Sequence, residues 1–241
     1  MSLGRALTAD TQEDFSLVRI VMLGNSNCGK TSILRRWEGS PYTEQTPTNG
    51  IDIISRNVTV NVGNAAITAR VHAWDTSGRK CHTPVCKSFI YNASVVILCY
   101  DVNDPDTTDS LTYWKAVADS ALKHRAQFVV AACKSDTRPC RCVAQDGFHC
   151  TPCTNAPLSH GAVFARLQAM PFFLTSARYN DNVNALFHAA AYNALQAVAD
   201  HPWPPFAVRL CPKDAATLGA RFQTPPSTPK KRARSRSCCL F

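Results

Sequence analysis

The sequence predicts a doubly wound α/β fold, in which a mostly parallel β-sheet carries helices on both faces. Three short, nearly continuous apolar runs at residues 17–23, 94–100 and 127–133 are rich in β-branched side chains. Such runs are typical of strands that are buried on both faces of a parallel sheet. Residues 107–124 and 181–198 carry apolar side chains at helical spacing and alternate with these strands. Strands that alternate with amphipathic helices indicate this fold class.

Two further runs, residues 51–62 and 66–74, depart from this rhythm. Residues 63–65 (Gly-Asn-Ala) separate them, so the two runs predict a β-hairpin and therefore one antiparallel pair of strands. A helical stretch is expected at residues 32–38, and a short apolar run occupies residues 171–174.

Residues 139–161 form a loop of about 23 residues with little periodicity, and a loop that long in a compact domain is either functional or disordered. Two close cysteine pairs could supply the tetrahedral ligands of zinc, but the first pair has one intervening residue where two to four are usual. We favour the alternative, a cysteine-rich surface insertion. The candidate zinc ligands are Cys140, Cys142, Cys150 and Cys153, and a weaker group is Cys81, His82 and Cys86.

The composition is that of an ordinary globular protein, with 45% hydrophobic and 18% charged residues in a chain of 241, which excludes a wholly disordered or fibrous chain. Residues 1–15 lack the apolar stretch of a secretory signal, so the 12 cysteines are not expected to form a disulfide framework. The longest apolar run, residues 95–100, is far short of a membrane span. We expect a soluble chain unless a lipid anchors it.

The net charge of +9 is concentrated at the C-terminal end. The last 41 residues hold 8 Lys and Arg but 1 Asp or Glu, and they are rich in Pro and Ser. Such a segment cannot build a core, so it is expected to be largely disordered. The predicted organisation is a flexible extension at residues 1–15, one folded domain at 16–198 and a basic tail at 199–241.

Residues 24–31 (Gly-Asn-Ser-Asn-Cys-Gly-Lys-Thr) directly follow the first predicted strand and fit the phosphate-binding pattern G-x-x-x-x-G-K-[ST]. Glycines in such a P-loop let backbone N–H groups point at phosphate oxygens beside a helix N-terminus. Lys30 is expected to reach the β- and γ-phosphates, and the Thr31 hydroxyl to bind Mg²⁺. The nucleotide-binding residues predicted here are Gly24, Ser26, Asn27, Cys28, Gly29, Lys30, Thr31 and Ser32.

Three later segments predict metal coordination and base recognition. Residues 74–78 (Trp-Asp-Thr-Ser-Gly) close the hairpin, where Asp75 can hold Mg²⁺ through water and the Gly78 N–H can contact a γ-phosphate. After the third buried run, Asp136 in Cys-Lys-Ser-Asp can accept both donors on the Watson–Crick edge of guanine, which adenine does not offer in that pattern. Residues 175–177 can offer a backbone N–H to the guanine carbonyl.

With these motifs the sequence resembles the Ras superfamily of small GTPases, over about residues 16–198. Its WDTSG, CKSD and TSAR segments are similar to the family's WDTAG, NKSD and TSAK. Residues 48–52 (TNGID) are similar to the Rab segment TIGVD, which makes Thr48 the expected Mg²⁺ ligand of the first switch loop. Residues 100–102 (YDV) and Trp114 also fall at Rab positions, although we favour a core role for Trp114.

The resemblance implies a P-loop NTPase fold with a six-stranded sheet, and a switch that cycles between GTP and GDP with Mg²⁺ to regulate vesicle traffic. Effectors, an exchange factor and a GTPase-activating protein would bind at two switch loops, around Thr48 and Gly78. The catalytic positions that the resemblance implies are Lys30, Thr48, Gly78 and Arg79, the Mg²⁺ ligands are Thr31, Thr48 and Asp75, and the other nucleotide contacts are Cys133, Lys134, Asp136, Ser176, Ala177 and Arg178.

Two residues depart from the family pattern. Arg79 stands where the family usually has a glutamine that orients the attacking water, and a guanidinium has donors but no acceptor. We therefore expect slow intrinsic GTP hydrolysis, or dependence on an activating partner. Cys133 stands where an asparagine would tie the P-loop to the base. Nucleotide affinity should fall by about 1–3 kcal/mol if a buried polar partner of that amide goes unmet.

Two alternative functions remain open, the first because of these departures. One is a pseudo-GTPase that serves as a fixed interaction scaffold, because both replaced side chains serve the nucleotide. The other is a Rho- or Ras-like signalling GTPase, because the insertion before Thr175 lies roughly where Rho proteins carry an extra helix.

The last four residues, Cys238-Cys239-Leu240-Phe241, fit the C-a-a-X prenylation pattern and resemble the CCxx ending of some Rab proteins. The basic residues at 230–236 would add about 1 kcal/mol each near an anionic leaflet, which favours a membrane over nucleic acid as the partner. We expect a prenyltransferase and a prenyl-binding chaperone as partners, no nucleic acid, and a monomer. The predicted location is the cytoplasmic face of intracellular membranes, with a cytosolic pool.

Overall fold

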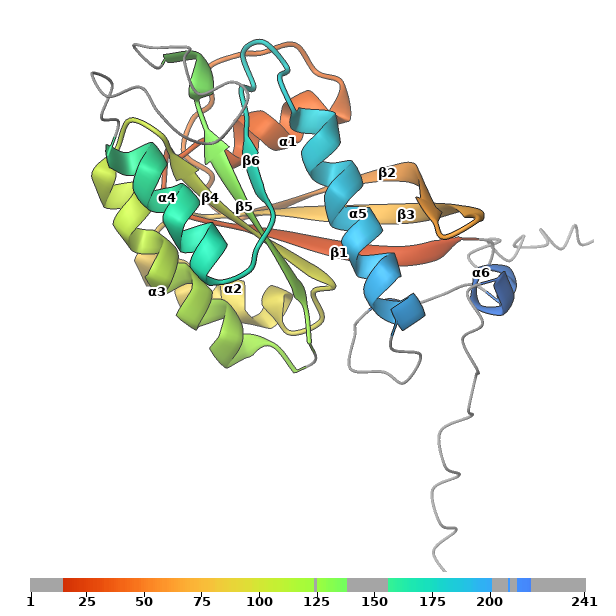
Figure 1. Ribbon diagram of the computed structural model, residues 1–241. Coiled ribbons are helices and arrows are strands. Elements are labelled where there is room, and N and C mark those ends of the chain that lie inside the picture. Colours follow the sequence, from red (N-terminus) through yellow and green to blue (C-terminus); the bar gives the residue numbers. More distant parts are fainter. Residues whose placement is uncertain (1–14, 124, 138–155, 201–207, 209–211, 218–241) are drawn as a thin grey trace, which may run out of the picture.

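The computed structural model describes residues 15–123, 125–137, 156–200, 208 and 212–217, and its centre is one six-stranded sheet (Figure 1). The strand order is β2-β3-β1-β4-β5-β6. Strands β2 and β3 are antiparallel, and every other neighbouring pair is parallel. The strands are β1 (Ser16–Leu23), β2 (Ile51–Val62), β3 (Ala65–Thr76), β4 (Val95–Asp101), β5 (Gln127–Cys133) and β6 (Phe172–Leu174). The predicted fold class is confirmed.

Helices cover both faces of the sheet (Figure 1). Helices α1 and α5 pack on one face, and α2, α3 and α4 pack on the other. The helices are α1 (Lys30–Glu38), α2 (Thr83–Ile90), α3 (Pro105–Ala121), α4 (Ala156–Leu167), α5 (Val183–Asp200) and α6 (Pro212–Thr217), and two 3₁₀ turns are η1 (Lys80–His82) and η2 (Ser135–Thr137).

Strand β1 shows why the central strands are almost wholly apolar. Successive side chains of a strand point to opposite faces, and both faces here are covered by helices. Ile20 and Met22 belong to the core under α1 and α5, whereas Val21 and Leu23 belong to the core under α2 and α3. Each such buried side chain contributes about 1.5–3 kcal/mol relative to an exposed one.

The parallel register brings the carboxyl ends of four strands to one edge of the sheet. Met22 of β1 pairs with Asp75 of β3, and Asp101 of β4 pairs with Cys133 of β5. Ligands of open α/β sheets bind at this edge, beyond the carboxyl ends of the strands. The predicted phosphate, metal and base segments therefore start from the same side of the molecule.

The structure corrects the predicted loop at residues 139–161. Helix α4 begins at Ala156 and runs to Leu167, so the last part of that segment is helical. The four candidate zinc ligands within it lie outside the described residues. Helix α2 was not predicted, because its eight residues include Thr, Pro, Val and Ile, which are poor helix formers in the absence of tertiary contacts.

Six residues of the basic tail, Pro212–Thr217, form helix α6. Helix α6 lies near the amino end of β1 (Figure 1). The Ser16 hydroxyl donates a buried hydrogen bond of 2.6 Å to Asp214 of α6, and Val208 packs against the core. Part of the segment after Asp200 is therefore attached to the domain.

None of the helices in the described part of the chain combines the length and the apolar character that a membrane-spanning helix requires.

Candidate functional site

The P-loop leaves β1 at Gly24 and enters α1 at Lys30, in a geometry that glycine makes accessible. Gly24 has φ 153° and Gly29 has φ 108°, both in the region that side chains rarely adopt. A Cβ on Gly24 would also lie 2.2 Å from the carbonyl oxygen of Cys99 on β4. The two glycines of the sequence pattern therefore stand where the loop needs them.

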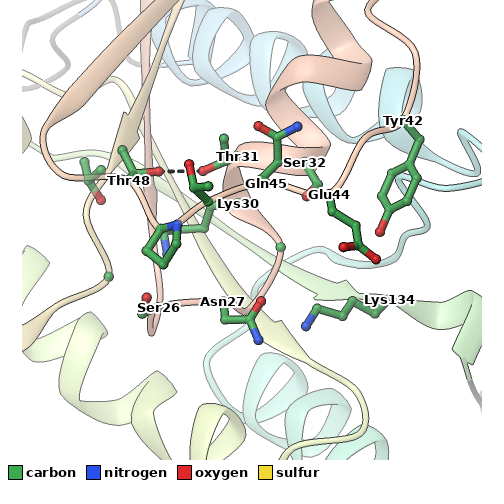
Figure 2. A pocket seen from close by; sticks show the side chains of 15 residues that line it. Ser26, Asn27, Lys30, Thr31, Ser32, Tyr42, Glu44, Gln45, Thr48 and Lys134 are labelled. Carbon is green, nitrogen blue, oxygen red and sulfur yellow. Dashed lines mark hydrogen bonds between the residues drawn. The ribbon is translucent and has the colours of Figure 1, made fainter.

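A cavity of about 340 Å³ opens against this loop at the carboxyl edge of the sheet (Figure 2). The P-loop forms its floor, and residues 42–48, which lead into β2, form one wall. Its polar lining includes residues that the sequence did not single out, namely Tyr42, Glu44 and Gln45. The predicted site residues that line it are Ser26, Asn27, Gly29, Lys30, Thr31, Ser32, Thr48, Gly78 and Lys134.

The three predicted Mg²⁺ ligands converge at one end of the cavity. The Thr31 hydroxyl lies 2.6 Å from Asp75 Oδ2 and 2.8 Å from the Thr48 hydroxyl, a contact drawn in Figure 2. The Thr48 hydroxyl is also 3.1 Å from Asp75 Oδ2. These side chains come from α1, β3 and the loop before β2, so the fold brings distant segments to one point.

The second carboxylate oxygen of Asp75 fits a cation. Asp75 is 1% exposed, and its Oδ1 is buried without a hydrogen-bond partner. Burial raises the pKa of this carboxyl, and hydrogen bonds from Thr31 and Thr48 together with the nearby Lys30 charge oppose that rise. A carboxylate and two hydroxyls are hard oxygen donors of the kind that Mg²⁺ prefers. The residues present therefore fit the ion.

The Lys30 ammonium is fixed by the loop in which it lies. It donates to the carbonyl oxygens of Gly24 at 3.0 Å and Asn25 at 2.8 Å, and the side chain is 5% exposed. A phosphate in the cavity that Lys30 lines would meet a preorganised cation.

Gly78 packs directly on the P-loop. A Cβ at this position would lie 2.2 Å from the Ser26 nitrogen, and the Gly78 carbonyl accepts a hydrogen bond from that same N–H at 3.2 Å. The next residue, Arg79, is exposed, and its backbone N–H is 3.5 Å from the Ser77 hydroxyl. The segment that begins at Gly78, the expected second switch loop, therefore contacts the P-loop.

Lys134 lines the cavity, whereas the other residues predicted to contact the base, Cys133, Asp136, Ser176, Ala177 and Arg178, are not among its lining residues. Near Lys134, charged side chains are already paired. The Ser176 hydroxyl donates to Asp136 Oδ1 at 2.6 Å, which orients the carboxylate predicted to recognise guanine. Lys134 has φ 60° and forms a 2.8 Å ion pair with Asp101 at the end of β4. Ala177 follows Ser176 and is buried, and Arg178 is exposed.

Cys133 lies in an apolar environment made partly of other thiols. Cys133 is 1% exposed, and a Cβ added to Gly29 would lie 3.1 Å from the Cβ of Cys133. Burial raises the pKa of Cys99 and that of Cys28, the latter to about 11, and the neighbouring Cys133 adds to both shifts. Among the described residues, the buried side-chain nitrogens and oxygens without a partner are Arg36 Nε and Asp75 Oδ1. Neither belongs to the P-loop, and the lower nucleotide affinity expected from Cys133 stays a prediction.

Trp114 is a core residue, as expected, but its indole also reaches the P-loop. It is 1% exposed, and its Nε1–H donates to Asn25 Oδ1 at 2.9 Å. The sequence did not predict the Trp114–Asn25 hydrogen bond or the Asp101–Lys134 ion pair. The first joins residues 89 positions apart and the second joins residues 33 positions apart. The YDV motif at the end of β4 was the available signal for Asp101.

The second candidate metal group is not assembled. Cys81 is exposed whereas Cys86 is buried, and His82 pairs with the Ser77 hydroxyl at 2.9 Å. Across the described residues, no cluster of three or more His, Cys, Asp or Glu side chains is arranged to hold a metal ion. Cys238 and Cys239 lie outside the described residues.

This fold and this cavity define a P-loop nucleotide-binding protein. In its site, Thr48 from a separate loop lies beside Thr31 of the P-loop. The Ras family model matches residues 19–196, and the chain belongs to the Ras family of small GTPases. It is accordingly a GTPase switch of the Ras superfamily, a class that binds guanine nucleotide and Mg²⁺.

Individual relatives come from more than one branch of the superfamily. Human Rho-related GTP-binding protein RhoD is 30% identical over 193 residues, 77% of this chain and 87% of that protein. The Caenorhabditis elegans Ras-related protein rab-39 is 28% identical over 189 residues, 76% of this chain and 75% of that protein. The Saccharomyces cerevisiae Ypt/Rab-type GTPase YPT7 is 28% identical over 189 residues, covering 75% and 83%. Identity at this level does not separate the Rab and Rho branches.

Proposed function

We propose that the chain is a GTP-gated switch of the Rab type, which regulates vesicle traffic from the cytoplasmic face of an intracellular membrane. The observation that carries the switch is the meeting of Thr31 and Thr48 on Asp75. Thr48 lies in the loop before β2, so occupancy of the cavity and the position of that loop depend on the same contacts. The Rab assignment rests on the TNGID segment and on the number of Rab and Ypt proteins among the relatives.

Each site residue then has a role that its contacts support. Lys30, held by two carbonyls, neutralises charge on the phosphates, and P-loop N–H groups bind phosphate oxygens. Asp75, Thr31 and Thr48 would hold Mg²⁺, which would supply positive charge against the phosphate oxygens. Asp136, oriented by Ser176, accepts from the guanine edge. Loss of the γ-phosphate would release Thr48 and Gly78 together with their loops.

The nucleotide content of the purified full-length chain tests the switch against a fixed scaffold. We expect bound GDP or GTP by chromatography, and release of a fluorescent GDP analogue that chelation of Mg²⁺ accelerates. Asp119→Asn is a suitable control variant, because Asp119 is exposed and pairs only with Lys115 in the described part of the chain. Absence of nucleotide together with failure to bind added GTP would overturn the proposal.

Slow intrinsic hydrolysis is proposed because Arg79 is exposed at the start of the second switch loop and has no acceptor for the attacking water. Arg79→Gln supplies both a donor and an acceptor there. We expect the single-turnover rate of GTP hydrolysis to rise by about 10-fold or more. An unchanged rate in a variant that still binds GTP would contradict this part of the proposal.

The lipid anchor is proposed from Cys238 and Cys239 together with the basic run before them. The double variant Cys238→Ser/Cys239→Ser is expected to move the protein from the membrane fraction to the soluble fraction of cells. A basic-run variant, Lys230→Gln/Lys231→Gln, should weaken membrane association without abolishing it. Equal membrane content in the double variant and the wild type would exclude the anchor.

A Rho-type signalling GTPase is the second candidate, because RhoD is 30% identical over most of both chains. The two candidates differ in the enzyme that would prenylate them. Prenylation of the purified chain by the Rab-specific transferase, and not by a transferase that reads a C-a-a-X ending alone, is expected for a Rab-type protein. The reverse preference would favour the Rho assignment.

A further inference from the structure

Asn25, the second residue of the P-loop, lies behind the cavity rather than in its lining. Its carbonyl oxygen accepts from the Lys30 ammonium at 2.8 Å and from the Cys28 N–H at 3.4 Å. A Cβ on Gly78 would lie 2.3 Å from the Asn25 carbonyl carbon. The backbone of Asn25 therefore contacts the phosphate-binding lysine and the start of the second switch loop at once.

The side chain of Asn25 is held by helix α3. Its Oδ1 accepts from the Trp114 indole N–H at 2.9 Å, and its Nδ2 donates to the Asp106 carbonyl at 3.4 Å. Trp114 is one of the largest fully buried side chains, so its indole cannot move without disturbing the core. The hydrogen bond therefore ties a loop to a helix that packs in the core.

The residue beside Trp114 holds the second switch loop. The Tyr113 hydroxyl lies 3.0 Å from the Thr83 hydroxyl, which donates at 2.7 Å to the Lys80 carbonyl. The Lys80 ammonium lies 5.1 Å from the centre of the Tyr113 ring. The Tyr113 and Trp114 rings are themselves in edge contact, with centroids 5.2 Å apart. Both anchors are therefore adjacent on α3, which packs beside α2 (Figure 1).

We infer that Asn25, Trp114 and Tyr113 are positioning residues, through which α3 couples the P-loop to the second switch loop. Trp114 fixes the Asn25 backbone, and with it the carbonyl that accepts a hydrogen bond from Lys30. Tyr113 fixes the turn at Lys80, so a displaced switch loop shifts α3 and loosens the P-loop. This regulation of nucleotide release rests on the proposed switch function.

Hydrogen exchange of P-loop amides tests the coupling whether or not nucleotide binds. In the full-length chain, Trp114→Phe keeps an aromatic ring in the core and removes only the indole donor. We expect exchange within residues 24–31 to quicken by about 5- to 30-fold, as loss of one partly buried hydrogen bond predicts. Asn25→Ala, which removes the acceptor instead of the donor, should do the same.

Trp37→Phe is the matched control. Trp37 is a buried tryptophan that stacks on Phe187 in the opposite core, and no P-loop contact of its indole is seen among the described residues. It should lower overall stability to a similar degree and leave P-loop exchange unchanged. Equal P-loop exchange in Trp114→Phe and Trp37→Phe would reduce Trp114 to a packing residue and overturn the inference.

Tyr113→Phe tests the second half of the coupling. We expect faster exchange both at residues 80–86 and at the P-loop, and faster release of a fluorescent GDP analogue by about 3- to 10-fold. A change confined to residues 80–86 would contradict coupling through α3. If the wild type binds no guanine nucleotide, the proposed function fails while the exchange data still decide the positioning roles.

Discussion

The two ends of the cavity differ in how their charges are satisfied. At the phosphate end, Thr31 and Thr48 share one oxygen of Asp75, and the other oxygen is buried without a partner. At the end lined by Lys134, which we call the base end, Ser176 donates a hydrogen bond to Asp136, and Lys134 forms an ion pair with Asp101. The phosphate end is electrostatically complete only with a cation and a phosphate, whereas the protein itself organises the base end.

This difference suggests a division of labour between the two ends. A buried carboxylate with an unpaired oxygen is unfavourable by itself, so the phosphate end should respond strongly to what occupies it. Side chains that are already hydrogen-bonded lose little freedom on binding, so the base end should contribute affinity and specificity at a low entropic cost. Variants at the two ends should therefore change different measured quantities.

The largest effect is expected for Asp75→Ala. It removes the buried carboxylate on which Thr31 and Thr48 meet, so GTP hydrolysis should fall by about 10³-fold and the effect of Mg²⁺ on GDP release should disappear. Single-turnover hydrolysis and GDP release with and without Mg²⁺ measure both. If GDP release from Asp75→Ala still depends on Mg²⁺, the ion binds elsewhere. The proposed difference between the two ends of the cavity would then be wrong.

A smaller loss, confined to affinity, is expected for Asp136→Asn. An amide offers one acceptor and one donor, so it cannot accept from both guanine donors, and GDP affinity should fall by about 100-fold. Xanthosine diphosphate, which presents a carbonyl where guanine has its amino group, should bind the variant more tightly than GDP. Equal loss for both nucleotides would mean that Asp136 acts only structurally.

Asp101→Asn should have a milder effect at the same end. Lys134 would lose its 2.8 Å ion pair, but the ammonium is partly exposed, so the gain from that pair is limited by solvent. We expect GDP release to quicken by about 3- to 10-fold, with hydrolysis per bound GTP unchanged. A drop in the hydrolysis rate itself would show that the two ends are not independent.

The smallest effect at neutral pH concerns the thiols between the two ends, because it develops only in alkaline solution. Burial raises the pKa of Cys28 to about 11 from its ordinary value of 9.0, so the folded state holds this proton more tightly than the unfolded state. The associated stability is complete below about pH 9 and is lost as the pH rises through about 11, a difference near 2 kcal/mol at about pH 10.5. Urea unfolding should show a shallower alkaline loss in Cys28→Val than in the wild type, and identical slopes would contradict the shift.

Local patterns were sufficient to predict the strand, the loop and the helix from which the phosphate end is built. The strand at residues 17–23, the P-loop and the following helix are contiguous, and each signal depends on near neighbours only. Thr48 and Asp75 came from short motifs, and the parallel sheet then had to bring them together. The hairpin turn was predicted one residue too long, because Ala65 already pairs in β3.

What could not be predicted depends on contacts between distant residues. Helix α2 has weak intrinsic propensity and owes its form to Cys86 and Ile90, which pack into the core under α3. The Trp114 hydrogen bond requires that α3 pass the P-loop at one particular register. No periodicity in the sequence reports that register, so a buried tryptophan could be predicted but its partner could not.

The position of α6 has a consequence for where the following chain leaves the domain. The Ser16–Asp214 hydrogen bond attaches this helix to the amino end of β1, and the P-loop begins at the other end of that strand, about 25 Å away. The chain that follows α6 therefore leaves the domain at the pole opposite the P-loop.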